Sequence, residues 1–511
     1  MTVWLVEHWL AVALFGLYTI ALMHNALTGL RASKSMRGFY VGNRNLSGPL
    51  IGLSFFATFA STNSYIGHAG KGYEYGLAWM VMPFMLIVFT YISWRWIGPR
   101  TRLLARNFDA LTLPDFLAAR FLHAKSDGRH PLRVVAALVV MLCSLLYLVA
   151  IFKGAGHLFE RFFNVPYQVA IGLALIVVML YTSIGGFVSV VRTDALQGVL
   201  MMIGAVLIFY FVTRAAGGVG AISQLSVMPD KQFIFELNGG IPFVVLFGIS
   251  LSGSLKLIVD PRQTSRFFAL KDEAALRSGM WVAIVGLTIV QLCLYPVGVY
   301  AHLLIDGVTD TDLIVPSLVN NAAIFPLWAG DFLFVAIVAA AMSSMDSVLL
   351  VAASTGYKNL VQPTFLKARV DASKPLRWTR LMVVALAILA AGLALEPPGD
   401  ILQITIFSGS LYAVCFLPAV VLGLYWSRGS ATAVLASMVV GTATLLIWLV
   451  LGYNTLMHEV FPALAASIVV YVICALGHSR RVDLNQLLTG ACAIDTRQWQ
   501  HRSAPDNLGE C

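Results

Sequence analysis

Residues 335–354 read VAIVAAAMSSMDSVLLVAAS, an apolar stretch of small residues with hydroxyl groups and one aspartate at its centre. At about 1.5 Å of rise per residue, a helix of this length crosses the hydrocarbon core of a bilayer. A carboxylate at mid-membrane costs about 2.5–3.5 kcal/mol on insertion scales, so it normally faces a partner, a cavity or an ion. Oxygen atoms that suit a small hard cation are offered by Ser343, Ser344, Asp346 and Ser347. Alternatively, the serines are small residues that allow close helix packing.

The composition places the whole chain in the membrane class. Of its 511 residues, 59% are hydrophobic and only 12% are charged, whereas an ordinary soluble domain has about 25% charged residues. The net charge of +9 does not indicate a nucleic-acid partner, because the Lys and Arg residues lie between apolar runs, where they report topology. The six cysteines include no Cys-x-x-Cys pair, so we expect no disulfide framework.

About thirteen apolar runs are expected to span the bilayer. They lie at residues 4–27, 46–69, 77–98, 132–152, 166–184, 194–213, 240–259, 279–304, 327–355, 379–396, 400–426, 430–452 and 459–477. Basic residues concentrate in the odd-numbered connections, for example Arg31, Lys34, Arg37 and Arg44 in the first and Arg262, Arg266, Lys271 and Arg277 in the seventh. The eighth connection is acidic. The positive-inside rule therefore predicts a multi-pass protein of the cell (inner) membrane, with its N-terminus outside and its C-terminus cytoplasmic.

Two of the apolar runs carry polar interruptions at mid-depth. The second contains hydroxyl residues and Asn63 between Ser54 and Gly70, and the seventh contains three serines and two glycines between Phe247 and Lys256. Side chains that compete for backbone hydrogen bonds favour unwinding, and unwound backbone at membrane depth is tolerated only where it lines protein or a cavity. Because the two runs are five spans apart, they have opposite orientations, which is the pattern of an inverted-repeat transporter.

Several motifs resemble those of the sodium:solute symporter family. GGFVSVVRTDALQ at 185–197 resembles its Gly-Gly…Thr-Asp-x-x-Gln stretch, and AAAMSSMDS at 339–347 resembles its Ala-Ala-x-Met-Ser-Thr-x-x-Ser stretch. FYVGNR at 39–44 resembles the entry motif of the family, and VLGLYW at 421–426 its late-helix motif. Residues 63–79 are most similar to the pantothenate permease branch.

The resemblance implies an all-α fold with a LeuT-type core, a 5+5 inverted repeat built from the second to the eleventh runs. The chain would then divide into an N-terminal extra helix (1–30), the core (37–426), two C-terminal helices (427–478) and a cytoplasmic tail (479–511).

A sodium site is implied between the first and eighth core helices. Its ligands would be the backbone carbonyls of Ala60, Asn63 and Ala340 and the hydroxyls of Ser343 and Ser344. The spacing agrees, because Ala340 and Ser343 are three residues apart and share a helix face.

Some members of the family use a second cation site or a proton relay. The matching positions here are Asp194, Ser343, Asp346 and Ser347. In many relatives position 346 is uncharged, so Asp346 departs from the common pattern, and it could add a cation, bind a proton or pair with a buried base. For Asp194 an alternative is a role as a helix cap after the Gly-Gly break, favoured by the helix dipole and free N–H groups.

Lys256 has two interpretations. It either extends toward the cytoplasmic surface near Asp260, or it faces the cavity and attracts an anionic group. The remaining substrate contacts are expected from Asn63, Ser64, Ser250 and Ser252, with Tyr147 and Tyr412 as cavity walls. His68 is expected at the outer boundary of the membrane.

No enzyme is indicated, because the chain has no nucleophile with its base, no His-x-x-x-His spacing and no phosphate loop. The prediction is a sodium-coupled symporter that imports a small organic solute, with a carboxylate (pantothenate-like or a monocarboxylate) as first choice. Its partners would be the solute, the sodium ion and the lipid bilayer. The alternatives are a symporter for a neutral amino acid such as proline, a proton-coupled transporter and, from another class, a membrane solute sensor on the same fold.

Overall fold

The structure is a computed structural model that describes residues 7–122, 129–237, 240–365, 373–478 and 481–489. Its described residues form helices joined by turns, with one isolated backbone bridge between Leu46 and Leu270. The α-helices are α2 (Trp9–Ala32), α3 (Met36–Val41), α4 (Gly48–Phe59), α5 (His68–Tyr75), α6 (Val81–Ile92), α7 (Gly98–Asn107), α8 (Leu113–Leu122), α9 (Pro131–Phe163), α10 (Tyr167–Ala215), α11 (Phe243–Val259), α12 (Pro261–Ala269), α13 (Glu273–Ala301), α14 (Ile314–Val319), α15 (Leu327–Gly356), α16 (Gln362–Phe365), α17 (Ser373–Leu393), α18 (Ile401–Leu417), α19 (Gly423–Tyr425), α20 (Ala431–Val450), α21 (Val460–Leu476) and α22 (Leu484–Thr489).

The predicted spans correspond to helices. Among the described residues, 10 helical segments are long and apolar enough to cross a membrane. Three shorter apolar helices, Gly48–Phe59, Tyr167–Met179 and Val460–Leu476, lie in the second, fifth and thirteenth predicted runs. The prediction of an all-α, multi-span membrane protein is therefore confirmed.

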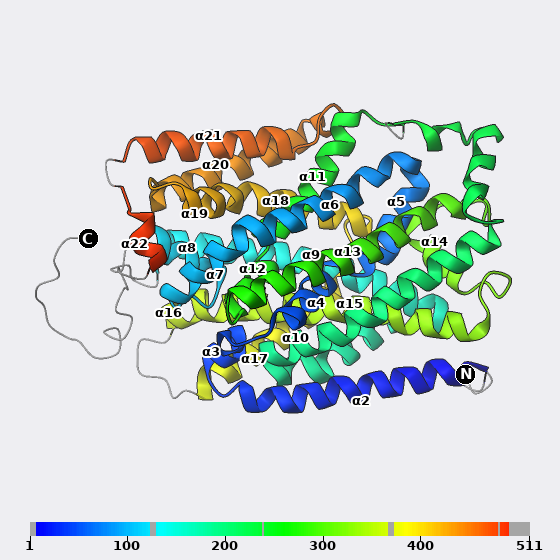
Figure 1. Ribbon diagram of the computed structural model, residues 1–511, viewed down its shortest axis with the longest axis horizontal. Coiled ribbons are helices and arrows are strands. Elements are labelled where there is room, and N and C mark those ends of the chain that lie inside the picture. The colour runs from blue at the N-terminus through cyan, green and yellow to red at the C-terminus, as the bar shows by residue number, and fades with distance from the viewer. Residues whose placement is uncertain (1–6, 123–128, 238–239, 366–372, 479–480, 490–511) are drawn as a thin grey trace, which may run out of the picture.

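Burial separates a central helix from peripheral ones. In α15, 94% of the most apolar stretch is buried inside the protein, whereas in α2 the share is 22%. Figure 1 shows α2 along one edge of the molecule and α20 and α21 along the opposite edge, with α15 between them. The segment that carries the serines and Asp346 therefore lies in the protein core, where a polar side chain needs a partner.

The second run is interrupted where the sequence predicts. Helix α4 ends at Phe59, and Ala60 adopts an extended conformation with φ −74° and ψ 105°. A π-helical turn, Asn63–Gly67, then leads into α5. The last carbonyls of α4 have no N–H group of a following helical turn to accept from, so they are available to other ligands.

The seventh run is also interrupted, but the prediction of where it breaks is wrong. Helix α11 continues through the serine- and glycine-rich stretch and ends at Val259, and Asp260 is extended with φ −62° and ψ 127°. The serines do not unwind the helix, because Ser250 and Ser254 donate to carbonyls four residues earlier in it. The break comes from Pro261, which restricts the residue before it and begins α12.

The fifth and sixth runs form one element, α10, that bends sharply at Gly186. This residue has φ 66° and ψ −171°, a conformation that a residue with a Cβ rarely adopts. A Cβ built there would also lie 2.6 Å from Oγ of Ser33, which follows α2. The Gly-Gly motif thus fixes both the bend and the close approach of α2.

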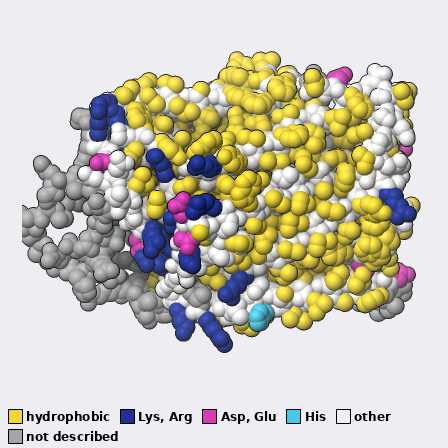
Figure 2. Space-filling model, in the orientation of Figure 1, with side chains coloured by type: hydrophobic (Ala, Val, Ile, Leu, Met, Phe, Trp, Pro, Cys, Tyr) yellow, Lys and Arg dark blue, Asp and Glu magenta, His cyan; other side chains and the backbone are white. Residues whose placement is uncertain are grey.

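Most of the predicted tail (479–511) lies outside the described residues. Of the part described, Leu484–Thr489 forms α22, and Asn107 donates hydrogen bonds to the carbonyls of Leu487 and Leu488. On the face drawn in Figure 2, most Lys and Arg side chains gather at the end of the molecule that carries α22. The opposite end shows few of them.

Candidate ion and solute sites

The serine pair of α15 faces the last turn of α4. Oγ of Ser343 lies 3.0 Å from the carbonyl oxygens of both Ala57 and Ala340. Oγ of Ser344 donates to the carbonyl of Thr58 over 3.0 Å. Both serines are fully buried, so hydroxyl and carbonyl oxygens meet in a dry place beside the break of the second run.

The predicted ligands divide into two groups. Ala340, Ser343 and Ser344 come together, and Ala60 is buried at the break directly after α4. The backbone carbonyl of Asn63, which was the predicted ligand, instead accepts from the N–H of His68, and the Asn63 side chain lines a separate cavity. The carbonyl that faces Ser343 belongs to Ala57, which sequence reasoning missed. It could have been found from the helix end, because the last turn of a helix leaves its carbonyls open.

Asp194 is the centre of a buried polar cluster rather than a helix cap. Its Oδ2 atom accepts hydrogen bonds from Ser54 (2.5 Å), Thr58 (3.1 Å) and Ser347 (3.4 Å). It also lies 2.8 Å from Nη2 of Arg266. The residue sits in the interior of α10, whose first residue is Tyr167 and whose bend is at Gly186, so the capping alternative is wrong.

Arg266 lies in the seventh connection, as the sequence predicts, but it is part of a buried polar cluster rather than an exposed charge. The residue belongs to α12, is fully buried, and donates from Nη2 to Thr58 Oγ1 (2.7 Å) and to Ser347 Oγ (2.6 Å) as well as to Asp194. It ties α12 to α4, α10 and α15. A basic residue at a span boundary counts equally in a topology rule whether it faces water or the protein core, which is why the pattern missed this role.

Asp346 is fully buried on α15, between the serine pair and Ser347. The base that it acts on electrostatically is Arg266, whereas Lys256 donates to a backbone carbonyl elsewhere. Two carboxylates, those of Asp194 and Asp346, therefore share the charge of one guanidinium. If both are ionised, two negative charges lie in the neighbourhood of this guanidinium.

A small cavity of about 20 Å³ lies between the two helix breaks. It is lined by Phe59, Asn63, His68, Met82, Tyr147, Gly253, Lys256, Arg262, Leu402, Thr405 and Ile406. Of the predicted substrate contacts, Asn63, Tyr147 and Lys256 line it. This volume has room for about one water-sized group, so protein atoms occupy most of the space between the lining residues.

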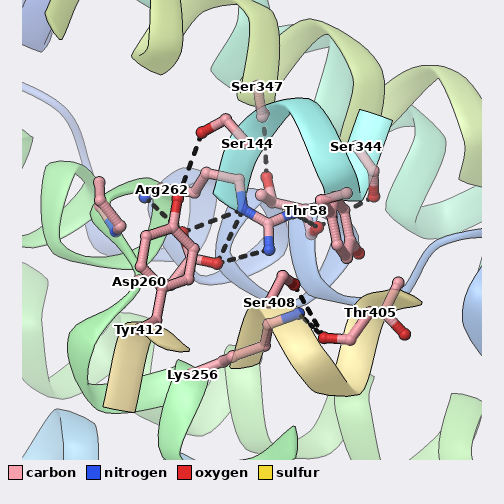
Figure 3. Close-up of polar contacts among 12 residues, drawn as sticks. Thr58, Ser144, Lys256, Asp260, Arg262, Ser344, Ser347, Thr405, Ser408 and Tyr412 are labelled. Atoms are coloured by element: carbon pink, nitrogen blue, oxygen red, sulfur yellow. Dashed lines mark hydrogen bonds and ion pairs between the residues drawn. The ribbon is translucent and has the colours of Figure 1, made fainter. Parts of the chain in front are cut away.

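Two cations border this cavity. Nζ of Lys256 donates to the carbonyl of Thr405 over 2.7 Å (Figure 3). It also lies 4.6 Å from the centre of the Tyr147 ring. The guanidinium of Arg262 lies 4.0 Å from the same ring centre, and its Nε and Nη2 atoms donate hydrogen bonds to the carboxylate of Asp260. Lys256 thus faces the cavity rather than the cytoplasmic surface.

The stem of Lys256 passes a glycine of α18. A Cβ at Gly409 would lie 3.2 Å from Cε of Lys256 and 3.0 Å from the carbonyl oxygen of Ser252. The missing side chain gives the lysine room to reach Thr405.

The other predicted contacts make hydrogen bonds within and between helices and do not line the cavity. Ser64 accepts from Gln291, and Ser250 donates to the carbonyl of Leu246. Ser252 bonds Ser410, and the hydroxyl of Tyr412 lies 3.2 Å from that of Ser144.

His68, which the sequence analysis expects at the outer boundary of the membrane, lies inside the protein. It is buried, stacks on Tyr295 with ring centres 4.6 Å apart, and lines the cavity. Its neighbour in the cavity wall is Asn63, whose Nδ2 atom lies 3.4 Å from Nε2 of His68, so the two side chains give this wall hydrogen-bonding groups.

Two lysines make ion pairs near the turn before α18. Nζ of Lys71 lies 3.1 Å from Asp400, and Nζ of Lys153 lies 2.8 Å from Asp312 and 3.3 Å from the carbonyl of Gly399. Both lysines thus hold the turn before α18, joining it to α5 and α9.

Comparisons with known proteins agree with this architecture. The family model described as the sodium:solute symporter family matches residues 39–441. The sodium/pantothenate symporter of Haemophilus influenzae is 28% identical over 88% of this chain and 92% of its own. The osmoregulated proline transporter OpuE of Bacillus subtilis is 31% identical over 93% of this chain and 96% of its own.

A solved structure extends the likeness to the fold. The substrate-bound, outward-open Na⁺-coupled sialic acid symporter has a TM-score of 0.78 at 19% identity and covers 93% of this chain and 98% of its own. This likeness confirms the predicted LeuT-type core, and a transporter family excludes an enzyme. With most of its length matched by the family model, the chain belongs to the sodium:solute symporter family.

Proposed function

We propose that this symporter imports a small organic carboxylate together with sodium. The observation that carries the proposal is Lys256, a buried cation that faces the cavity and is bound by a backbone carbonyl. Among the described residues, no carboxylate lies within ion-pair distance of it, since Asp260 is held by Arg262. Burying a charge without a counter-charge is costly, and a carboxylate solute supplies that counter-charge.

The charge of the cavity wall distinguishes the candidate solutes. The lining contains two cations and, among the described residues, no acidic side chain. A neutral amino acid such as proline is a zwitterion, and its ammonium group would find no carboxylate here and would be repelled by Lys256. Pantothenate and short monocarboxylates bring a negative charge alone. This favours the carboxylate over proline, although relatives of both kinds are known.

For sodium we propose the oxygens beside the break of the second run. The hydroxyls of Ser343 and Ser344 and the carbonyls of Ala340 and Ala60 supply ligands, and the Ala57 carbonyl takes the place that the sequence analysis gave to Asn63. Neutral oxygens suit an alkali cation and hold it loosely enough for release in each cycle.

The cluster around Asp194 is proposed to take a second cation. Asp194 and Asp346 are two buried carboxylates on facing helices, and the hydroxyls of Ser54, Thr58 and Ser347 add oxygens beside Asp194, a donor set that suits a hard cation. A sodium ion would bind beside Asp346 and Ser347, and a proton is the alternative occupant.

The orientation of the protein in the membrane follows from the distribution of its basic side chains. The basic end in Figure 2 is the one that carries α22, and the positive-inside rule places such an end in the cytoplasm. Trp9, the first residue of α2, would then lie at the outer face. We place α2 and the pair α20–α21 outside the ten-helix core.

A thermal-shift screen of the purified protein tests the choice of solute. We expect short monocarboxylates or pantothenate to raise Tm in sodium buffer, and to raise it less in potassium buffer, because a ligand stabilises only the state that it binds. Proline is the comparison. A larger shift with proline than with every carboxylate would contradict the carboxylate assignment and support the amino-acid alternative.

Replacement of Ser343 or Ser344 by Ala is expected to weaken sodium binding far more than folding. Losing one ligand of a buried site costs about 1–3 kcal/mol, which is roughly a ten- to hundredfold rise in the half-saturating sodium concentration. The measurement is a sodium titration of Tm or of uptake. Ser437→Ala is the control, because this buried serine of α20 donates only to a carbonyl of its own helix. Unchanged sodium dependence in both variants would support the packing interpretation.

A further inference from the structure

The guanidinium of Arg266 lies among the oxygens of the proposed second cation site. Its Nη2 atom is 2.8 Å from Oδ2 of Asp194, 2.7 Å from Oγ1 of Thr58 and 2.6 Å from Oγ of Ser347. These oxygens come from α10, α4 and α15, and all four side chains are fully buried. One positively charged nitrogen therefore has three oxygen partners from three helices, which is also the environment that a hard metal cation requires.

The arginine and a metal cation are alternatives at these oxygens. While Nη2 holds its position, the oxygens that face it cannot accept an ion from the same side. A second positive charge a few ångströms away is also strongly repelled, because no water screens the two charges in a buried cluster. A sodium ion that binds here must therefore displace the guanidinium.

One carboxylate oxygen of Asp194 is open to an incoming ion. Its Oδ2 atom accepts from Ser54, Thr58, Ser347 and Arg266. Its Oδ1 atom is buried and has no hydrogen-bond partner among the described residues. An unpaired acceptor in a dry interior is costly, so a cation gains a ligand at Oδ1 before the arginine has left Oδ2.

The guanidinium has other partners outside the ion cluster. Its Nη1 atom donates to the carbonyl of Arg262 in the same helix over 3.0 Å, and its Cζ atom lies 5.5 Å from the centre of the Phe187 ring. Helix α12 is itself separated from α11 by the extended residue Asp260. An arginine that leaves Asp194 thus keeps a hydrogen bond and an aromatic contact.

We propose that Arg266 is a built-in competitor of the second sodium ion, and that its guanidinium and the ion bind alternately to the oxygens of Asp194, Thr58 and Ser347. The inference rests on the proposed second cation site. Arg266 sets the sodium concentration at which this site fills, because the apparent affinity of a ligand falls with the fraction of protein whose site is open. Since Arg266 joins α12 to α4, α10 and α15, binding of the ion also releases α12 from these helices.

The test is the binding of radioactive sodium to the purified full-length protein, with choline chloride keeping the ionic strength constant. Arg266→Gln removes the competing charge. If the guanidinium holds the oxygens about nine-tenths of the time, its removal lowers the half-saturating sodium concentration of one site roughly tenfold. Sodium should also raise Tm more in this variant than in the wild-type protein, because a ligand stabilises the state that it binds more tightly.

Arg120→Gln is the matched control for the loss of a buried guanidinium. Arg120 belongs to α8, is 1% exposed, and donates to the carbonyls of Gly423 and Trp426 rather than to a carboxylate. Its replacement should leave the sodium-binding isotherm unchanged. An equal gain of sodium affinity in both variants would show that the effect does not come from the Asp194 cluster and would contradict the proposal.

The double variant Arg266→Gln/Asp194→Asn separates the inference from the proposal on which it rests. It removes both charges of the pair and should bind one sodium ion fewer than the wild-type protein. If it does, but Arg266→Gln alone binds sodium no more tightly than wild type or fails to fold even in saturating sodium, Arg266 only holds the cluster together and the inference is overturned. If the double variant binds as many ions as the wild-type protein, the second site itself is wrong.

Discussion

Lys256→Met is expected to raise the carboxylate concentration for half-maximal uptake roughly a hundredfold or more. Removing one partner of a buried charge pair costs about 2–5 kcal/mol, and each 1.4 kcal/mol is about a factor of ten. Methionine keeps the length of the aliphatic stem beside Gly409 and removes the charged ammonium group that donates to the Thr405 carbonyl. The measurement is the concentration dependence of uptake of the carboxylate that the thermal-shift screen selects.

The folded state should not suffer from this change. A cation whose partner is a backbone carbonyl is buried at a cost, so its replacement by an apolar side chain leaves Tm unchanged or raises it. Lys271→Gln, at a side chain that is 61% exposed, serves as the control for loss of one positive charge. Uptake with wild-type affinity in the Lys256→Met protein would show that the lysine does not receive the solute.

The second large effect is expected at Asp346. Asp346→Asn removes one of the two buried carboxylate charges of the cluster, so the proposed second cation loses its attraction. The Hill coefficient of sodium-driven uptake should fall toward one, and the half-saturating sodium concentration should rise at least tenfold, equivalent to about 1.4 kcal/mol. Sodium titrations of uptake at several pH values measure both quantities and reveal whether a proton is the natural occupant.

Two other outcomes have distinct meanings at this position. If Asp346 only pairs with Arg266, the substitution should destabilise the protein by about 3–5 kcal/mol, as expected when one partner of a buried pair is removed. Asp312→Asn, which breaks the ion pair with Lys153 far from the cluster, is the control for loss of a buried carboxylate. Wild-type sodium affinity, stoichiometry and pH profile in Asp346→Asn would show that this residue has no coupling role.

Much of the architecture could be predicted because the bilayer imposes strong constraints on a spanning chain. The length and apolarity of each run follow from the hydrocarbon thickness, and the predicted runs correspond to apolar helices. Polar residues in the second run indicated the break after Phe59. In the seventh run the polar residues led to a wrong position for the break, because serine hydroxyls can donate to carbonyls of their own helix. The helix breaks at Pro261 instead.

The candidate site could be predicted in part for the same reason. Ser343, Ser344 and Asp194 stand out because polar groups are rare and expensive at this depth. Their partners did not stand out. Ala57 contributes a backbone carbonyl that no side chain marks, and Arg266 lies near a span boundary, where a basic residue usually reports orientation. Such contacts depend on how helices far apart in sequence pack together.

The most direct test of sodium-coupled carboxylate import is uptake into proteoliposomes that contain only this protein. With sodium outside and potassium inside, we predict transient accumulation of the carboxylate above its external concentration, and collapse of that accumulation when the sodium gradient is dissipated. An imposed proton gradient without sodium should give equilibration at most, and a sensor would give no uptake at all. Equal accumulation driven by protons in the absence of sodium would contradict the account.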